Sequence, residues 1–471
     1  MAKKRKQQSF VIDPELERIG YDKTPTFILM VFWVYVVAWF LQLGSRIHFL
    51  GAIRIELVLA VSLVGLSFMV RRQRIKIKSN LPAFIAGYYF FVSITLLYSY
   101  DPDSSWTIYV DRFVKFSFMA FFIVLYVRSP LTLLAFLSAF LLAFFKLGQE
   151  GMVGQITGSL VWENQGVMRL NGPTPLYSHP NSFSGMALGT LPFIYYLFPL
   201  SNKWIKLFFA ILLVFSFNII LHAGSRTTYV GFFALVAYFL LKSDQKFKFF
   251  TIAAIVFVVA LPFVPEQYIE RFQSITGHEK EGHSKERRQE IIADALVIFS
   301  EHPFGVGVAA FPKVRTERFG RFQDTHNLYL EIATNFGIQG FIFWICMIVA
   351  IFRNISRLRT DINGQVATTE SRAPPAGEEP SPISKHLRDL KVMRAVLNAI
   401  EGYLVVRLVV GVFGHDTYEI YWWVILGNVI AIHNMNQVAA RITKYYAQGA
   451  AKKMEHSSNQ SLDNAVVNTS Q

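Results

Sequence analysis

Long apolar segments separated by shorter polar segments recur along the whole chain. Several reach the roughly 17 to 25 apolar residues that a helix needs to cross a bilayer. They include Thr26 to Leu43, Leu81 to Tyr98, Leu131 to Phe145 with its flanks, Trp204 to Leu221, Phe249 to Val264, and Gly340 to Phe352 with its preceding turns. The pattern predicts an all-α, polytopic membrane protein of about twelve transmembrane helices.

Basic segments follow every second predicted span and account for the net charge of +14. From the N-terminal MAKKRKQQ onward they are RRQRIKIK, VRSP, SNKWIK, KSDQKFK, the stretch from Arg353 to Lys391, and RITKYYAQGAAKK. The positive-inside rule places these segments and both termini in the cytoplasm. No small-residue cleavage site follows the first apolar run, so we expect it to stay as an anchor. Topology thus explains the charge, and we expect no nucleic-acid partner.

The predicted topology divides the chain into five parts. They are a cytoplasmic N-terminal segment (1–25), a membrane domain (26–352) with long outer loops at 146–181 and 265–325, a partly disordered cytoplasmic linker (353–390), the last two transmembrane helices (391–437) and a cytoplasmic tail (438–471). Disorder is expected from Ala367 to Pro382 and in the C-terminal HSSNQSLDNAVVNTSQ, which are rich in polar residues. Outer loops of such length are unusual unless they are functional.

The longer outer loop contains the sequence SKERRQEIIADALVIFSEHP, which has helical periodicity. Its spacing predicts an amphipathic helix over the membrane domain, ended by His302-Pro303 and a Gly-Val-Gly turn. The predicted apolar face holds Ile291, Ile292, Ala295, Leu296 and Phe299. Near its start stand Arg287 and Arg288, one of which is positioned to reach a ligand, unless both are solvated charges balanced by neighbouring glutamates.

A polar break, LHAGSRTTYVGFF, separates two apolar spans on the predicted outer side. We expect Gly224 to turn the chain and Ser225 to cap the helix that follows. Arg226, just inside that helix start, is suited to bind an anion such as a phosphate. The alternative is an interfacial anchor whose charged end reaches the membrane surface.

A second polar stretch, QDTHNLYLEIATNFGIQG, runs directly into an apolar segment. Asp324 or Thr325 is expected to cap a helix whose first turn holds His326 and Asn327. The positive end of the helix dipole would keep His326 neutral, which is the form that a general base requires. The alternative role for His326 is structural hydrogen bonding.

The other long outer loop ends in VMRLNGPTPLYSHPNSFSG, immediately before a span. Arg169, His179 and Asn181 are its polar residues of interest, and its glycines and prolines indicate a shaped loop. We expect these side chains to line a cleft rather than to perform catalysis.

Other chemistries lack support in the sequence. The DPD at Asp101 to Asp103 imitates a metal-binding acid pair but lies on the predicted outer side, where a solvated turn is favoured. Cys346 stands alone in an apolar span, which excludes disulfides and a Cys-based zinc site. The chain contains no HExxH, GxSxG or phosphate-binding loop. We therefore predict no metal site and no cofactor.

Taken together, these residues resemble the O-antigen ligase and polymerase superfamily of bacterial membrane glycosyltransferases. The blocks that carry the resemblance are GSRTTYVG, the stretch from Arg288 through EHPFGVGVAAF, THNLYLEIATNFGIQG and, more weakly, HPN. One departure is Ile292, at a position where the family often has tryptophan. The resemblance implies a GT-C-like fold with amphipathic helices in the long periplasmic loop.

The resemblance also implies an activity and its partners. A glycan would pass from undecaprenyl diphosphate to an acceptor at the periplasmic face of the bacterial inner membrane, without a metal, in contact with membrane lipids. Arg226 and Arg288 would hold the donor diphosphate, and His326 would act on the acceptor hydroxyl. The motifs leave open a ligase, whose acceptor is lipid A core, a polymerase, or a protein O-oligosaccharyltransferase. We favour the ligase, because a single long outer loop, the one before His326, holds both the second arginine block and the histidine, as members of the ligase group generally show.

A lipid-linked glycan transporter is the alternative from a different functional class. A transporter would need cationic residues in the middle of several spans, facing a central cavity. Most basic residues here lie at span ends, and the exceptions among the charged residues are Arg54, Glu56, Arg112, Lys115, Arg394 and Arg407.

Overall fold

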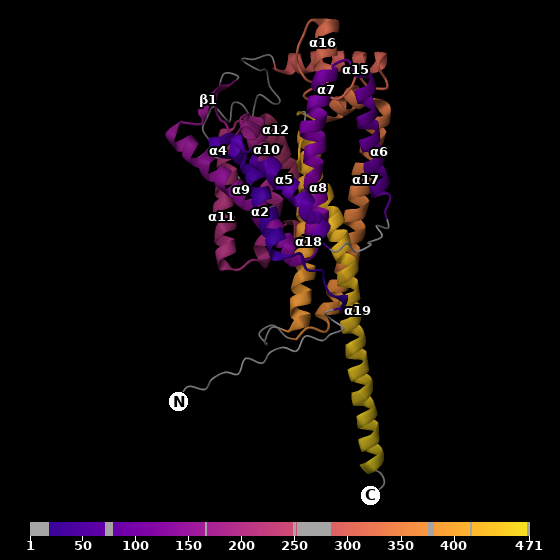
Figure 1. The fold of residues 1–471 in the computed structure, drawn as a ribbon. Coiled ribbons are helices and arrows are strands. Elements are labelled where there is room, and N and C mark those ends of the chain that lie inside the picture. Colours follow the sequence, from indigo (N-terminus) through magenta and orange to yellow (C-terminus); the bar gives the residue numbers. More distant parts are fainter. Residues whose placement is uncertain are drawn as a thin grey trace.

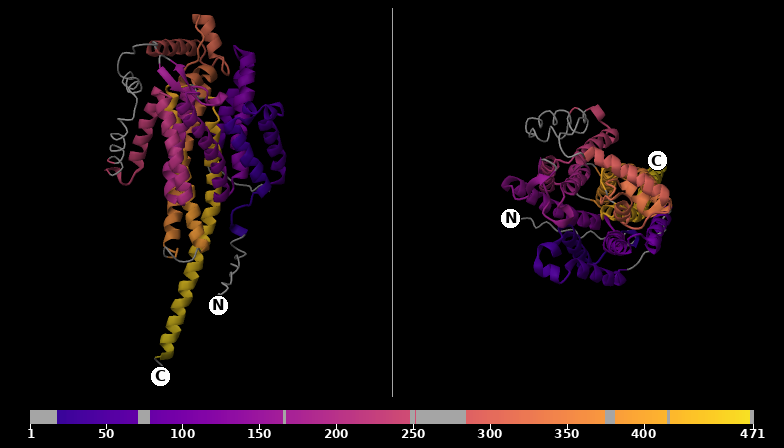
Figure 2. Two further views of the ribbon diagram at one scale, coloured as in Figure 1. Left: turned by 90° about the vertical axis from the view of Figure 1, so that its left-hand side faces the viewer. Right: turned by 90° about the horizontal axis from the view of Figure 1, so that it is seen from above.

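The computed structural model describes residues 18–70, 79–164, 167–247, 251, 284–374, 381–414 and 417–468. Most helices run side by side in one bundle (Figure 1). α15 (Ser284–Glu301) lies across the bundle axis at one end, and α16 (Phe311–Phe319) is beside it. We call this end the outer end. At the opposite end α19 (Tyr421–Asn468) extends beyond the other helices (Figure 2).

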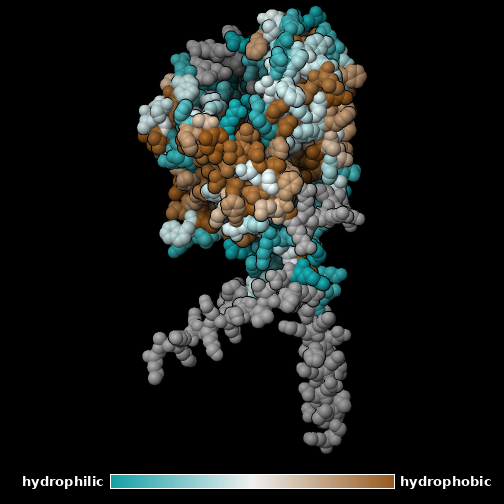
Figure 3. Space-filling view, in the orientation of Figure 1, coloured by the Kyte–Doolittle hydropathy of each residue, from teal (hydrophilic) through white to brown (hydrophobic). Residues whose placement is uncertain are grey.

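Five helices in the described part of the chain are long and apolar enough to cross a membrane. They are α6 with η2 (Leu81–Tyr98), α9 (Pro130–Thr157), α10 with η5 (Pro180–Leu200), α11 (Lys203–His222) and α17 (Leu328–Glu370). On the face seen in Figure 3, hydrophobic side chains gather across the middle of the molecule, with hydrophilic side chains above and below them. These features support a multi-pass membrane protein.

Shorter helices complete the described architecture. Two of them are apolar, α2 (Thr26–Leu41) and α5 with η1 (Ile55–Met69). The others are α3 (Leu43–Arg46), α4 (His48–Ala52), α7 (Pro102–Ile108), the π-helical η3 (Tyr109–Val114), α8 (Lys115–Tyr126), η4 (Pro175–Tyr177) and α12 (Arg226–Lys242). One further helix, α18 (Pro382–Gly411), is longer but carries several charges. The predicted number of about twelve spans is not shown, and the predicted span from Phe249 to Val264 lies almost entirely outside the described residues.

A small β-hairpin modifies the all-α prediction. β1 (Val161–Asn164) and β2 (Val167–Leu170) pair antiparallel, with Trp162 opposite Arg169. The hairpin follows α9, which extends to Thr157 and so occupies the first part of the predicted 146–181 loop. Along this extension, Gly148 and Gly151 let the Phe215 and Phe183 side chains approach the helix closely. The hydropathy pattern does not register such packing.

Helices also reach into segments that the sequence assigned to loops or disorder. α17 continues to Glu370, α18 starts at Pro382 and α19 runs to Asn468. Much of the predicted 353–390 linker and of the predicted disordered tail is therefore helical, while residues 375–380 lie outside the described residues. A helix satisfies its backbone hydrogen bonds internally, so polar composition alone does not end one.

Residues 284–319 form what we call the outer lobe: α15, the connecting loop and α16. The lobe has its own small core, separate from the main one, of Ala295, Ile298, Val306, Ala310, Phe311 and Val314. α15 ends at Glu301, before His302-Pro303, as predicted.

The buried face of α15 differs from the predicted face. Ile291, Asp294 and Ala295 are buried, whereas Ile292 and Leu296 are 41% and 55% exposed. The spacing located an apolar stripe on α15, but only one edge of that stripe packs against the rest of the lobe. The buried Asp294 carboxylate is compensated by an ion pair with Arg315, at 2.9 Å.

A kink in α17 joins the outer lobe to the bundle. Gly337 has φ 70 and ψ −176, and a Cβ there would clash with the backbone of Phe304. The loop after α15 lies along this kink, where Val306 N–H donates to Thr334 O at 2.9 Å and Ile338 N–H donates to Pro303 O at 2.9 Å. Only glycine fits the positive φ and the close approach at this position.

Candidate active site at the outer end

The turn between α11 and α12 has the predicted local geometry. Gly224 adopts φ 56, and the Ser225 hydroxyl accepts a hydrogen bond from Thr228 N–H at 3.3 Å. Ser225 is thus the N-cap of α12, and Arg226 is its first residue. The turn thus places an arginine beside the backbone N–H groups of a helix start, an arrangement suited to an anion.

Arg169 is buried beneath this turn and holds three segments together. Its side chain, on β2, is 1% exposed. Its Nε donates to Ala223 O at 2.7 Å, and its terminal nitrogen donates to Asn181 Oδ1 at 2.8 Å. Charge-assisted bonds of this kind are stronger than neutral ones. Arg169 therefore fixes the hairpin, the turn and the start of α10 relative to one another, and does not lie open in a cleft.

His179 and Asn181 form the entry to α10. His179 is the N-cap, and its Nδ1 accepts from Asn181 N–H at 3.2 Å while the side chain remains exposed. One turn further, Ser184 and Thr228 hydrogen-bond through their hydroxyls at 2.7 Å, which joins α10 to α12. We call residues 169–185 and 222–231 the turn side of the site.

Arg288 belongs to the opposite side of the site. It lies on α15, partly exposed, with its guanidinium carbon 5.9 Å from the centroid of the Phe413 ring. Arg287 is exposed. Phe413 follows directly after α18, so Arg288 approaches the C-terminal end of that helix.

His326 precedes α17 and is not part of its first turn, contrary to the sequence prediction. Asn327 is the N-cap, and its Oδ1 accepts from Tyr329 N–H at 3.0 Å and Leu330 N–H at 3.1 Å. The amide oxygen of Asn327 satisfies both donors, so neither Asp324 nor Thr325 caps the helix. We call α15 and residues 323–328 the lobe side of the site.

The turn that carries His326 has an unusual backbone. His326 adopts φ 49, in the left-handed region that non-glycine residues rarely occupy. The buried Thr325 hydroxyl donates to Asn327 O at 3.0 Å and ties the turn together. Nε2 of His326 lies 2.9 Å from the Gln323 amide nitrogen. Strained residues of this kind are held in place by their surroundings and cluster at functional sites.

The two sides meet at the C-terminal end of α18. On the lobe side, Asn327 Nδ2 donates to Val412 O at 3.0 Å, and Leu328 packs against Gly411. On the turn side, Gly231 of α12 faces Val410 of α18. The sequence blocks of Arg226, Arg288 and His326 therefore converge on residues 410–413.

Sequence reasoning missed several buried polar residues near this junction. Arg407 of α18 is 4% exposed, lies 3.7 Å from the centroid of the Tyr421 ring and donates to Gly185 O at 3.4 Å. The available signal was an arginine within an apolar helix, which the sequence pattern related only to a transporter. Arg407 instead links α18 to α10 beneath the turn side.

Glu331 is the second such residue, one turn into α17. It is 1% exposed, and its carboxylate accepts from Thr417 N–H at 3.2 Å and from the Thr417 hydroxyl at 2.6 Å. Beside it, burial raises the pKa of Tyr418 well above its ordinary value, and the Tyr418 hydroxyl accepts from Ala309 N–H at 2.8 Å. These contacts attach the segment after α18 to both α17 and the outer lobe.

Metal-binding geometry is not found in the described part of the chain, where no three His, Cys, Asp or Glu side chains cluster. Asp101 of the DPD sequence caps α7 by accepting from Ser104 N–H at 3.5 Å. Its carboxylate also lies 3.9 Å from Lys313 of α16. Asp101 thus has a structural role at a helix start.

Comparison with known protein families matches one part of the chain. Residues 211–345 match the O-antigen ligase family. No curated protein matches the chain. The matched family supports a membrane enzyme that transfers glycans, with lipid-linked glycans as its substrate class. Residues 211–345, which hold Arg226, Arg288 and His326, therefore form an O-antigen ligase domain.

Proposed function

We propose that the protein is an O-antigen ligase, which transfers a glycan from undecaprenyl diphosphate to lipid A core at the periplasmic face of the inner membrane. The observation that carries the proposal is the convergence of the Arg288 and His326 blocks on Val412 and Phe413, at the same end as the Arg226 turn. Two cationic groups and a potential base thus come from segments far apart in the sequence. Both termini are assigned to the cytoplasm from the distribution of basic segments.

Arg226 and Arg288 are assigned to the donor diphosphate. A sugar attached through a diphosphate leaves as an anion that needs little protonation, so the main requirement is stabilisation of negative charge. A guanidinium binds phosphate oxygens through two parallel N–H groups, which a lysine ammonium does not provide. Arg288 is favoured over Arg287, because Arg288 faces Phe413 while Arg287 is exposed. Arg169 and Asn181 hold the turn before α12 in position, and the His179 side chain is exposed at the start of α10.

His326 is assigned as the general base. It removes the proton of the acceptor hydroxyl as the acceptor oxygen bonds to C1 of the sugar and the C1–O bond to the diphosphate breaks. In the orientation described, the Gln323 amide donates to Nε2, so that nitrogen carries the lone pair, and the acceptor hydroxyl takes the place of the Gln323 amide there before it gives up its proton. Since His326 precedes the N-cap, the contact with Gln323, rather than the dipole of α17, supports the neutral form. Asn327 sets the position of the turn by capping α17.

Deletion of the gene followed by electrophoresis of lipopolysaccharide tests the proposal. A ligase predicts core without O-antigen, together with accumulated long carrier-linked polymer. Core that bears one repeat unit would identify a polymerase, and a glycoprotein that loses its glycan would identify a protein O-oligosaccharyltransferase. An unchanged ladder would overturn the proposal. Complementation with the wild-type gene should restore the ladder, whereas a His326→Ala gene should not.

A further inference from the structure

A cavity lies apart from the candidate active site, between α2, α5 and the segment formed by η3 and α8. Its volume is about 700 Å³, within the range of pockets that hold small ligands. Helices α2 to α5 lie at the edge of the bundle in both views of Figure 2. The cavity therefore lies at the edge of the bundle, and none of the residues that line it belongs to the proposed glycan site.

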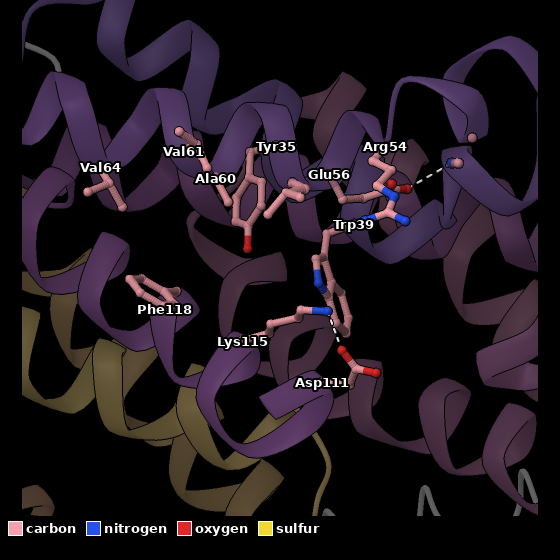
Figure 4. A pocket seen from close by; sticks show the side chains of 13 residues that line it. Tyr35, Trp39, Arg54, Glu56, Ala60, Val61, Val64, Asp111, Lys115 and Phe118 are labelled. Carbon is pink, nitrogen blue, oxygen red and sulfur yellow. Dashed lines mark hydrogen bonds and ion pairs between the residues drawn. The ribbon is translucent and has the colours of Figure 1, made fainter. Parts of the chain in front are cut away.

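The polar residues of the cavity gather at one end of it. Arg54 and Glu56 come from the start of α5, and Asp111 and Lys115 come from η3 and the start of α8 (Figure 4). Their charges sum to zero. Lys115 pairs with Asp111, and Glu56 Oε1 accepts from Gly44 N–H at 2.8 Å.

Arg54 differs from the other charged residues of this cavity. Within the described part of the chain, its exposed guanidinium has no ion-pair or hydrogen-bond partner. Its backbone is in the left-handed region, at φ 50, where it forms the N-cap of α5. An anion bound in the cavity would give this guanidinium a charge-assisted partner.

The remainder of the cavity is apolar. Beyond the charged end, α5 contributes Leu57, Ala60, Val61 and Val64, α8 contributes Phe118, and α2 contributes Tyr35. On both α5 and α8 the charged residues come first and the apolar residues follow. The cavity thus has a polar end with both charges and a long apolar wall.

We infer that this cavity binds a membrane glycerophospholipid with a zwitterionic head group, such as phosphatidylethanolamine. Arg54 and Lys115 bind the phosphate, Asp111 binds the ammonium, and an acyl chain lies along the apolar stripe of α5. Because the site itself has no net charge, it favours a head group that carries both charges over one that carries only a phosphate. This inference does not depend on the proposed glycan transfer.

Native mass spectrometry of the full-length protein, released from detergent with equal amounts of phosphatidylethanolamine and phosphatidylglycerol, tests the inference. The wild-type protein should retain phosphatidylethanolamine preferentially. Arg54→Gln and Lys115→Met should each weaken its binding about tenfold, which corresponds to loss of one charge-assisted contact. Asp111→Asn leaves the site cationic and should reverse the preference in favour of phosphatidylglycerol.

Lys146→Met is the matched control. Lys146 pairs with Glu150 at the same i,i+4 spacing and has a similar exposure, 48% against 54% for Lys115, but it does not line the cavity. Its lipid binding should equal that of the wild type. A wild-type preference for phosphatidylglycerol, or an Asp111→Asn preference unchanged from wild type, would overturn the inference. Since the readout is bound lipid, neither result bears on glycan transfer.

Discussion

Arg169 and Arg288 belong to the two sides of the candidate site, and their surroundings differ. Arg169 is 1% exposed and donates to Ala223 O and Asn181 Oδ1, both in elements of the membrane bundle. Arg288 is partly exposed on the outer lobe and faces an aromatic ring. Buried, charge-assisted hydrogen bonds join the turn side to the membrane bundle, whereas the outer lobe has one buried ion pair of its own, between Asp294 and Arg315, and a small separate core.

This difference indicates a division of labour within the site. Elements with few buried contacts open at lower free-energy cost than elements in the main core. The turn side is therefore expected to keep a fixed position, while the outer lobe, which carries Arg288, is expected to open more easily. The two sides are expected to respond differently to substitution.

The largest effect is expected on the lobe side, at His326. His326→Ala should reduce glycan transfer about 10²- to 10⁴-fold, because a positioned general base contributes that much to rate. The amount of protein in the membrane should not change. The measurement is lipopolysaccharide ladder formation in a deletion strain.

His302→Ala provides the matched control for His326. His302 also lies on the outer lobe, where its Nδ1 is 3.3 Å from the Tyr100 hydroxyl. It should retain transfer. Transfer by His326→Ala near the wild-type rate would remove His326 from the mechanism.

Breaking the buried ion pair of the outer lobe should loosen the lobe and leave the turn side unchanged. Asp294→Asn leaves Arg315 buried and uncompensated, at a cost of about 3 kcal/mol to the lobe. Hydrogen exchange should rise in α15 and α16 and stay unchanged in α10 and α12. Glu301→Gln, which removes an exposed pair with Arg318, should change little. Equal loss of protection on both sides would contradict the comparison.

Arginine-to-lysine substitutions test which guanidinium groups contact the diphosphate. Arg226→Lys and Arg288→Lys should each lower transfer roughly 10- to 100-fold, because lysine lacks the paired donors. Arg287→Lys should have little effect, since Arg287 is exposed. The measurement is the transfer rate at matched protein levels. A mild effect of Arg226→Lys would reassign Arg226 as an interfacial anchor.

The smallest effects are expected at the two helix caps. Asn327 accepts two N–H groups at the start of α17, whereas Ser225 accepts one, at 3.3 Å, at the start of α12. Asn327→Ala should cost about 1–2 kcal/mol and Ser225→Ala about 0.5–1 kcal/mol. Thermal unfolding of both variants in the same detergent would show which substitution lowers stability more. A larger loss for Ser225→Ala would show that the turn side depends more on its cap.

The sequence by itself determined the apolar pattern and the local turn chemistry. The pattern located most of the described long apolar helices, Gly224 and Ser225 indicated the turn before α12, and His302-Pro303 indicated the end of α15. The resemblance of GSRTTYVG and THNLYLEIATNFGIQG to the O-antigen ligase superfamily is confirmed for residues 211–345. All these features depend on residues within a few positions of one another.

Only the tertiary structure decided what these segments contact. It buried Arg169 and Arg407, turned α15 onto Asp294 rather than Leu296, moved the cap of α17 to Asn327, and brought three motif blocks to the end of α18. It also gathered Arg54 and Lys115 in one cavity, although each had appeared only as an isolated charge in an apolar span. The physical reason is that burial and compensation of a charge depend on partners from distant segments, which periodicity along one segment does not specify.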